Sequence, residues 1–193
     1  MRVDGWSCGF RGRPLERYWG ASAVKQADDR LLFEAFFALE YRSVVSLGFV
    51  LSGSWEAAED LAQDAFAAAH RDWQRIGCYD KPGAWVRRAV SNRAISLRRK
   101  RASEHDIARR LVGTSSPDDQ LSPADHELWA RVRCLPRRQA QLVALVYLED
   151  RSVKEASDIL GISEPTAKTH LQRARRRLAE ELEIEEQSEM EQT

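Results

Sequence analysis

Apolar residues recur along most of this chain at the three- and four-residue spacing of amphipathic helices. A first helix is predicted from Asp28 to the "LSGS" break at 51–54. A second helix follows that break, and a third is predicted from about Gly83 to Arg101. The residues predicted to be buried are Leu32, Phe33, Phe36, Phe37, Tyr41, Val44 and Val45, then Ala58, Leu61, Ala62, Ala65, Phe66, Ala69 and Trp73, then Trp85, Val86, Ala89, Val90, Ala94, Ile95 and Leu97.

The periodicity disappears over residues 102–123, where "GTSSPDDQLSP" is rich in residues that favour turns. Helical patterns then return over 124–134, 136–148, 152–160 and 163 to about 183. No alternating strand pattern is present, so we expect an all-α fold of two small helical domains joined by a flexible linker. The expected divisions are a flexible N-terminal arm (1–27), a first domain (28–101), the linker (102–123), a second domain (124–183) and an acidic tail (184–193).

The stretch "SVKEASDILGISEPTAKTHLQRARRRL" predicts a helix, a tight turn and a second helix. Ser152 and Glu155 form a capping box, Gly161 suits a left-handed turn, and Ser163 suits an N-cap. With an inward apolar stripe and cations elsewhere, the second helix suits the major groove of DNA. A solvated basic face on a helical hairpin is the alternative. The residues predicted to contact DNA are Ser163, Glu164, Thr166, Lys168, Thr169, Gln172, Arg173 and Arg176.

The charge of the 193-residue chain sharpens this picture. Thirty Lys and Arg residues balance thirty Asp and Glu residues, so the net charge is zero. The signs are nevertheless segregated, because Lys and Arg crowd into 87–110 and 168–177 while Glu crowds into 180–191. Segregated cations indicate a polyanionic partner that meets particular patches.

Other kinds of chemistry find little support in the sequence. Cys8, Cys78 and Cys134 lack CxxC spacing and look like reduced thiols, and the four histidines show no joint spacing with them. No phosphate loop or nucleophile motif is visible, so we expect no enzyme, no metal site and no cofactor. No apolar stretch approaches the roughly 20 residues of a membrane-spanning helix, and no signal peptide is apparent, so we expect a cytoplasmic protein without membrane insertion.

Two segments of the first half, "AAEDLAQDAFAAAHRDW" and "KPGAWVRRAVSNRAISLRRKR", resemble region 2 of the sigma-70 family, in its extracytoplasmic-function (ECF) group. The helix-turn-helix pattern, preceded by "LPRRQAQLVALVYLED", resembles the last region of the same family. The resemblance covers roughly residues 30–101 and 123–182 and implies a subunit that directs RNA polymerase to promoters. It also implies two helical domains, of which the second reads the −35 element.

Two groups of residues in the first domain take their expected roles from this resemblance. An acidic-polar strip on the second helix is expected to dock on the clamp helices of the polymerase β′ subunit; its members are Glu59, Asp60, Gln63 and Asp64. An ordinary solvated face is the alternative. The −10 element is expected to meet the third helix and the loop before it, through Tyr79, Asp80, Arg87, Arg88, Asn92, Arg98 and Arg99. For Tyr79 and Asp80, loop packing and helix capping remain the alternatives.

The partners implied by the resemblance are core RNA polymerase (the β′ clamp helices and the β flap), promoter DNA and an anti-sigma factor. The runner-up is a stand-alone DNA-binding regulator of the LuxR type, whose recognition helix also resembles "TAKTH". Such regulators carry an α/β domain at the front, which this sequence does not predict. A third interpretation is an interaction adaptor or anti-sigma-like module, which would bind polymerase without any DNA dependence on Lys168 or Arg173.

Overall fold

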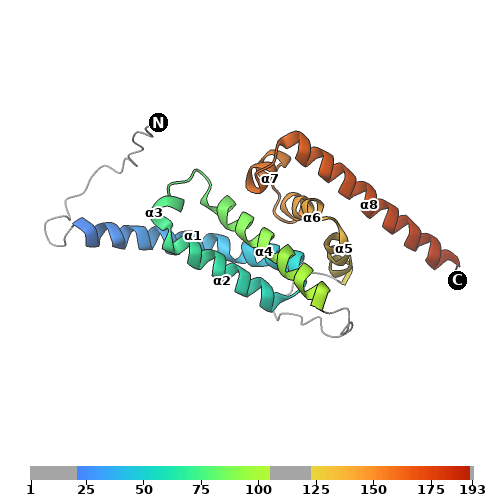
Figure 1. Cartoon of the computed structure of the whole chain (residues 1–193), viewed down its shortest axis with the longest axis horizontal. Coiled ribbons are helices and arrows are strands. Elements are labelled where there is room, and N and C mark those ends of the chain that lie inside the picture. The colour runs from blue at the N-terminus through green and yellow to red at the C-terminus, as the bar shows by residue number, and fades with distance from the viewer. Residues whose placement is uncertain (1–20, 105–122, 192–193) are drawn as a thin grey trace.

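The computed structural model of the chain describes the backbone of residues 21–104 and 123–191, and side chains over 32–100 and 125–181. Within these ranges the regular secondary structure is entirely helical, so the all-α prediction is confirmed. Two groups of helices lie side by side, the first drawn in blue and green and the second in yellow to red (Figure 1). The predicted linker lies mostly outside the described residues, as do residues 1–20 of the predicted arm.

The first group contains α1 (Ala21–Ser52), α2 (Trp55–Arg71), the short α3 (Trp73–Ile76) and α4 (Pro82–Glu104). Ser54 caps α2 by accepting a hydrogen bond from the backbone N–H of Ala57 at 3.3 Å. The helices pack through most of their predicted apolar faces, and α1 contacts both α2 and α4. The side chains buried at their centre include Val44, Leu47, Val50, Leu51, Ala58, Ala62, Phe66, Ile76, Val86, Val90, Ala94 and Ile95. The predicted burial of Leu32 and Phe37 was wrong, because both are exposed on the first half of α1.

The second group contains α5 (Pro123–Cys134), α6 (Arg137–Val143), the π-helical turn η1 (Ala144–Leu148), α7 (Val153–Leu160) and α8 (Glu164–Glu191). The single helix predicted over 136–148 therefore changes to π geometry in its last turn. The side chains buried at the centre of this group include Trp129, Val132, Leu142, Leu145, Ala156, Leu160, Ala167, Leu171 and Ala174.

Several predicted boundaries were wrong. Residues 21–27, expected to belong to the arm, are the first turns of α1, because this Ala-rich stretch has high helix propensity. Similarly, α4 extends to Glu104, and α8 continues into the predicted tail as far as Glu191. At the start of α4, Lys81 rather than Asp80 occupies the position before the first helical residue, Pro82.

The segment Leu32–Ser52 of α1 is long and apolar enough to cross a membrane, with 21 residues and a mean hydropathy of 1.3. The prediction that no apolar stretch approaches the length of a membrane-spanning helix was therefore wrong. Here the second half of this segment packs into the core, where Val44, Leu47 and Leu51 are fully buried. The core helix of a helical bundle has this composition because it meets neighbours on several sides.

The two groups also pack against each other, a contact that the expected flexible tether did not predict. Helix α1 contacts α5 and η1, and α4 contacts α7. The buried apolar side chains of both groups form one continuous cluster. Their relative placement decides which faces of α4 and α8 are open to a partner.

Candidate nucleic-acid interfaces

The turn between α7 and α8 has the geometry that its sequence predicts. Gly161 is left-handed, with φ 64° and ψ 43°, a conformation that a side chain would strain. Ser152 and Glu155 form the capping box at the start of α7. At the start of α8, the Ser163 hydroxyl accepts a hydrogen bond from the Thr166 N–H at 3.3 Å. The helix-turn-helix prediction is therefore confirmed in its local geometry.

The inward stripe of α8 is buried as predicted, with Ala167, Leu171 and Ala174 packed in the core. All the predicted DNA-contacting residues lie on the remaining surface, where they are exposed except for the half-buried Glu164. Lys168 pairs with Glu164 at 2.7 Å, and this hydrogen bond holds the pKa of the Glu164 carboxyl below its usual value. The side chain of Arg176 is 73% exposed and lies 3.6 Å from Glu180. The long basic face of α8 is thus open along its described length.

The four members of the acidic-polar strip are exposed on the first three turns of α2. Leu61, Ala62 and Phe66 on the opposite side of the helix are buried. Asp64 pairs with Arg93 of α4 at 3.3 Å, and both side chains of this pair are mostly exposed. The strip therefore presents carboxylates and an amide to solvent, as the sequence predicts.

The loop before α4 carries both predicted base-contacting residues. Tyr79 is 41% exposed, and its backbone N–H donates to the Ile76 carbonyl at 3.0 Å. Asp80 is also exposed. An exposed aromatic ring on a turn that is held by a backbone hydrogen bond is suited to stacking against a base.

Comparisons with known proteins agree with this geometry. Residues 36–104 match the family model described as sigma-70 region 2, and residues 125–178 match the one described as sigma-70, region 4. The ECF RNA polymerase sigma factor SigM of Mycobacterium tuberculosis is 30% identical over 173 residues, which cover 89% of this chain and 87% of that protein. SigM of Bacillus subtilis, another ECF sigma factor, is 34% identical over 128 residues, or 63% of this chain and 77% of that protein.

The chain belongs to the sigma-70 family, in its ECF group. Its fold is also similar to that of the sigma factor RpoE from Bartonella quintana, solved in complex with the anti-sigma factor NepR. That likeness has a TM-score of 0.63 at 24% identity and covers 79% of this chain and 97% of the other. The sigma-70 family consists of transcription factors rather than catalysts. We call α1–α4 region 2 and α5–α8 region 4 from here on.

The predicted cationic stripe of region 2 is only partly open in this structure, because Arg88 and Arg99 are exposed whereas its other members are enclosed to some degree. Arg87, expected on an outward face of α4, is 2% exposed. Its guanidinium contacts Glu149 of region 4 at 2.5 Å and Glu40 of α1 at 2.7 Å. Burial alone would lower the pKa of Arg87, but the carboxylates of Glu149 and Glu40 outweigh it and raise that pKa.

Other members of the stripe also lie against region 4. Asn92 accepts hydrogen bonds from Arg137 at 2.6 Å and from Gln141 at 3.0 Å. Arg88 reaches the turn glycine of the helix-turn-helix, where a Cβ added to Gly161 would lie 2.9 Å from the Arg88 Nη2 atom. Arg99 is exposed, whereas Arg98 is half-buried and its burial lowers its pKa.

Sequence reasoning missed the partners that bring the two regions together. Glu149 and Ser43 contact Arg87 of α4, and Glu155 contacts Lys81 just before α4. None of these three residues was predicted to be a site residue. Arg87 and Glu149 are separated by 62 positions, so no local spacing links them. Glu149 follows η1, whose wider turn ends with the Glu149 N–H donating to the Ala144 carbonyl at 3.3 Å.

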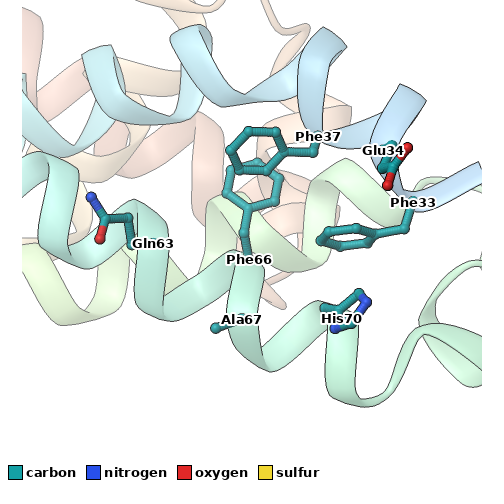
Figure 2. Close-up of a pocket in the computed structure, with 7 residues that line it drawn as sticks. All are labelled: Phe33, Glu34, Phe37, Gln63, Phe66, Ala67 and His70. Atoms are coloured by element: carbon teal, nitrogen blue, oxygen red, sulfur yellow. The ribbon is translucent and has the colours of Figure 1, made fainter. Parts of the chain in front are cut away.

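A pocket beside the acidic-polar strip was also not foreseen. Its volume is about 510 Å³, and it lies between α1 and α2 (Figure 2). The Phe33 ring meets His70 edge-on with 4.7 Å between ring centroids, and Phe37 meets Phe66 at 4.9 Å. Gln63 belongs to both the pocket and the strip. The lining residues are Phe33, Glu34, Phe37, Gln63, Phe66, Ala67 and His70.

The described residues contain no group of three or more His, Cys, Asp or Glu side chains that could hold a metal ion. Cys78 and Cys134 are both exposed free thiols, one in each region. Cys8 lies outside the described residues.

Proposed function

We propose that this protein is an initiation subunit that binds core RNA polymerase and directs it to promoters, acting in the cytoplasm without catalysis of its own. The single observation that carries the proposal is that region 2 and region 4 occur in one chain, with matches at 36–104 and 125–178. A LuxR-type regulator is not favoured, because the α/β domain expected for it is replaced by the helical region 2.

Region 4 is proposed to read the −35 element with the start of α8. Thr166, Lys168 and Thr169 lie in its first turns, where an inserted recognition helix meets base edges. The arginines further along the helix are suited to the phosphate backbone. This arrangement is supported by the capped, rigid turn and by the exposure of the whole basic face.

Region 2 is proposed to hold the −10 element with α4 and its preceding loop. The exposed ring of Tyr79 is the proposed platform for an unstacked base, and Asp80 lies beside it. The proposed phosphate and sugar contacts are Arg87, Arg88, Asn92, Arg98 and Arg99.

The polymerase surface is proposed to be the strip Glu59, Asp60, Gln63 and Asp64 together with the adjoining aromatic pocket. Gln63 joins the two features, so one partner helix could pair cations with the strip and place an apolar side chain in the pocket against the rings of Phe37 and Phe66. The β′ clamp helices are the proposed occupant. The β flap is proposed to meet region 4, and an anti-sigma factor is proposed as a regulator.

Run-off transcription tests the function directly. Purified core polymerase is combined with the protein and a pool of genomic fragments from the source bacterium, and discrete 5′ ends are mapped. We expect promoter-specific transcripts that depend on the added protein. If core enzyme with the added protein still starts transcription without promoter specificity, the proposal is contradicted and a stand-alone regulator is favoured instead.

A charge-reversal pair tests the polymerase surface. Asp60→Arg places a cation at the centre of the strip and should weaken binding to core polymerase by roughly thirtyfold or more, as expected for a central interface residue. Asp72→Arg makes the same charge change beyond the end of α2, where it disrupts only an exposed pair with Arg75. Equal affinities of the two variants for core polymerase would remove the strip from the interface.

A further inference from the structure

Arg87 is enclosed by groups from both regions. Its guanidinium contacts Glu149 at 2.5 Å, Glu40 at 2.7 Å and the Ser43 hydroxyl at 3.0 Å, and Ser43 in turn donates to Glu149 at 2.6 Å. The side chains of Arg87 and Glu149 are 3% and 2% exposed. Within this cluster Glu149 alone belongs to region 4, so the pair exists only while the regions are together.

A buried ion pair of this kind couples the two regions. Separating them would expose Glu149 to water and leave Arg87 with Glu40, which is a modest change because both charges remain solvated or paired. Removing the Glu149 charge while the regions stay together would instead leave the Arg87 guanidinium with one fewer buried partner. The closed arrangement therefore depends on the charge of Glu149.

Further contacts cover the same face of region 2. Lys81, next to the proposed base-contacting loop, pairs with Glu155 of α7 at 2.9 Å. Asn92 is occupied by Arg137 and Gln141 of α6. Together with the buried Arg87 and the exposed Arg88, these residues lie on the face of region 2 that is proposed to meet the −10 element. Region 4 and DNA would therefore compete for this face.

We call the contact surface between region 2 and region 4 the seam. Like charges on its two sides oppose the packing of the regions against each other. Arg138 of α6 is affected first by burial and then by the nearby charges of Arg137 and Arg88, all of which lower its pKa. Arg133 of α5 is likewise affected by burial and by Arg98 of α4. A polyanion that entered the seam would relieve this repulsion. The polar part of the contact between the regions is thus open to competition from a polyanion.

We propose that the packing of region 4 on region 2 is a self-inhibited state of the free protein, in which Glu149 holds Arg87 away from DNA. The two regions separate when single-stranded promoter DNA takes over Arg87 and its neighbours. This inference rests on the proposed −10 role of α4. It assigns regulation to the chain itself, before any other protein binds.

Zero-length cross-linking of the full chain with a carbodiimide tests the closed state. The reagent activates a carboxylate, and an amine in contact displaces it to form an amide. In the monomeric fraction of the wild type we expect a Lys81–Glu155 cross-link by mass spectrometry, because these groups are 2.9 Å apart across the seam. The Glu164–Lys168 pair, 2.7 Å apart within α8, is the internal control that should form in either state.

Glu149→Gln removes the charge that couples the regions, and Asp150→Asn is its matched control. Asp150 is the exposed neighbour with φ 49°, a conformation that asparagine also tolerates. We expect the Lys81–Glu155 cross-link to fall in Glu149→Gln and to persist in Asp150→Asn. Affinity for a fluorescein-labelled single-stranded oligodeoxynucleotide of mixed sequence should rise roughly tenfold in Glu149→Gln only. This is the change expected if the fraction of molecules with separated regions, which can bind DNA, grows from about a tenth to nearly all.

A measurement on the wild type alone keeps the test valid even if Glu149→Gln misfolds. Adding the oligodeoxynucleotide to the wild type should suppress the Lys81–Glu155 cross-link and spare the Glu164–Lys168 one. A wild type that never forms the seam cross-link, or forms it equally with DNA bound, overturns the self-inhibited state. That outcome is distinct from failure of the proposed function, which appears as absent promoter-specific run-off whatever the cross-link shows.

Discussion

Helices α4 and α8 carry similar cationic sequences but are presented differently. Arg87 of α4 lies between two carboxylates with its side chain 3% exposed, whereas the Arg176 side chain of α8 is 73% exposed. Helix α4 packs on α1 and α2 and also meets region 4, while α8 packs on α6 and α7 of its own region. The comparison shows that the neighbours of an arginine-rich helix decide which of its arginines are open to solvent.

The largest expected difference between the two helices is in stability. Ile95→Ala on α4 removes a side chain that is 1% exposed and should lower the free energy of unfolding by about 2–5 kcal/mol. Leu178 of α8 is half-buried, so Leu178→Ala should lower the free energy of unfolding by only about 1 kcal/mol. Urea denaturation of both variants measures the difference. Equal costs would show that the two helices are enclosed to the same degree.

The next largest effect tests the proposal that the open face of α8 binds DNA. Arg173→Ala should weaken binding to a −35 duplex by about 1–3 kcal/mol or reduce the salt slope by about one phosphate contact. Arg71→Ala, at the end of α2, removes the same charge from region 2 and is the control. Affinity is measured by fluorescence anisotropy across a salt series. If both variants bind the duplex like the wild type, α8 is not the helix that binds the −35 element.

A pH effect probes the seam that covers α4. The hydrogen bond from Lys81, with those from Ser152, lowers the pKa of Glu155 to about 2 from an ordinary 4.5. Because the folded pKa is depressed, the stability it contributes is present above about pH 4.5 and is lost as the pH falls toward 2. Thermal melting midpoints should therefore decline over this window, and less steeply in Lys81→Gln. Parallel curves for the two proteins would show that Lys81 does not act on Glu155.

The smallest effect concerns the base of α8. Arg175 donates to the Tyr147 hydroxyl at 2.5 Å and lies 5.6 Å from the centre of its ring. Tyr147→Phe removes the hydrogen bond and keeps the ring. The free energy of unfolding should therefore fall by less than about 1 kcal/mol, because the pair is exposed. Thermal unfolding of the variant measures it. A loss of several degrees or more would mean that α8 depends on Tyr147 far more than its exposure suggests.

Local features of the fold were predictable because they depend on neighbours in the chain. The capping box at Ser152, the left-handed Gly161 and the apolar stripes of α2 and α8 follow from side chains three or four positions apart. The family resemblance added the two regions and their order, which the comparisons confirm. The residue-level contacts with DNA and polymerase stay predictions.

The sequence alone determined the all-α class, the division into two helical groups and the helix-turn-helix, since these follow from periodicity, turn residues and capping within single segments. Only the tertiary structure decided that Arg87 is buried and paired. Its partner Glu149 lies 62 positions away and meets it only when the two regions pack together. The same holds for the aromatic pocket, which needs Phe37 of α1 and Phe66 of α2. Contacts between distant segments depend on how whole helices pack, and no local pattern encodes them.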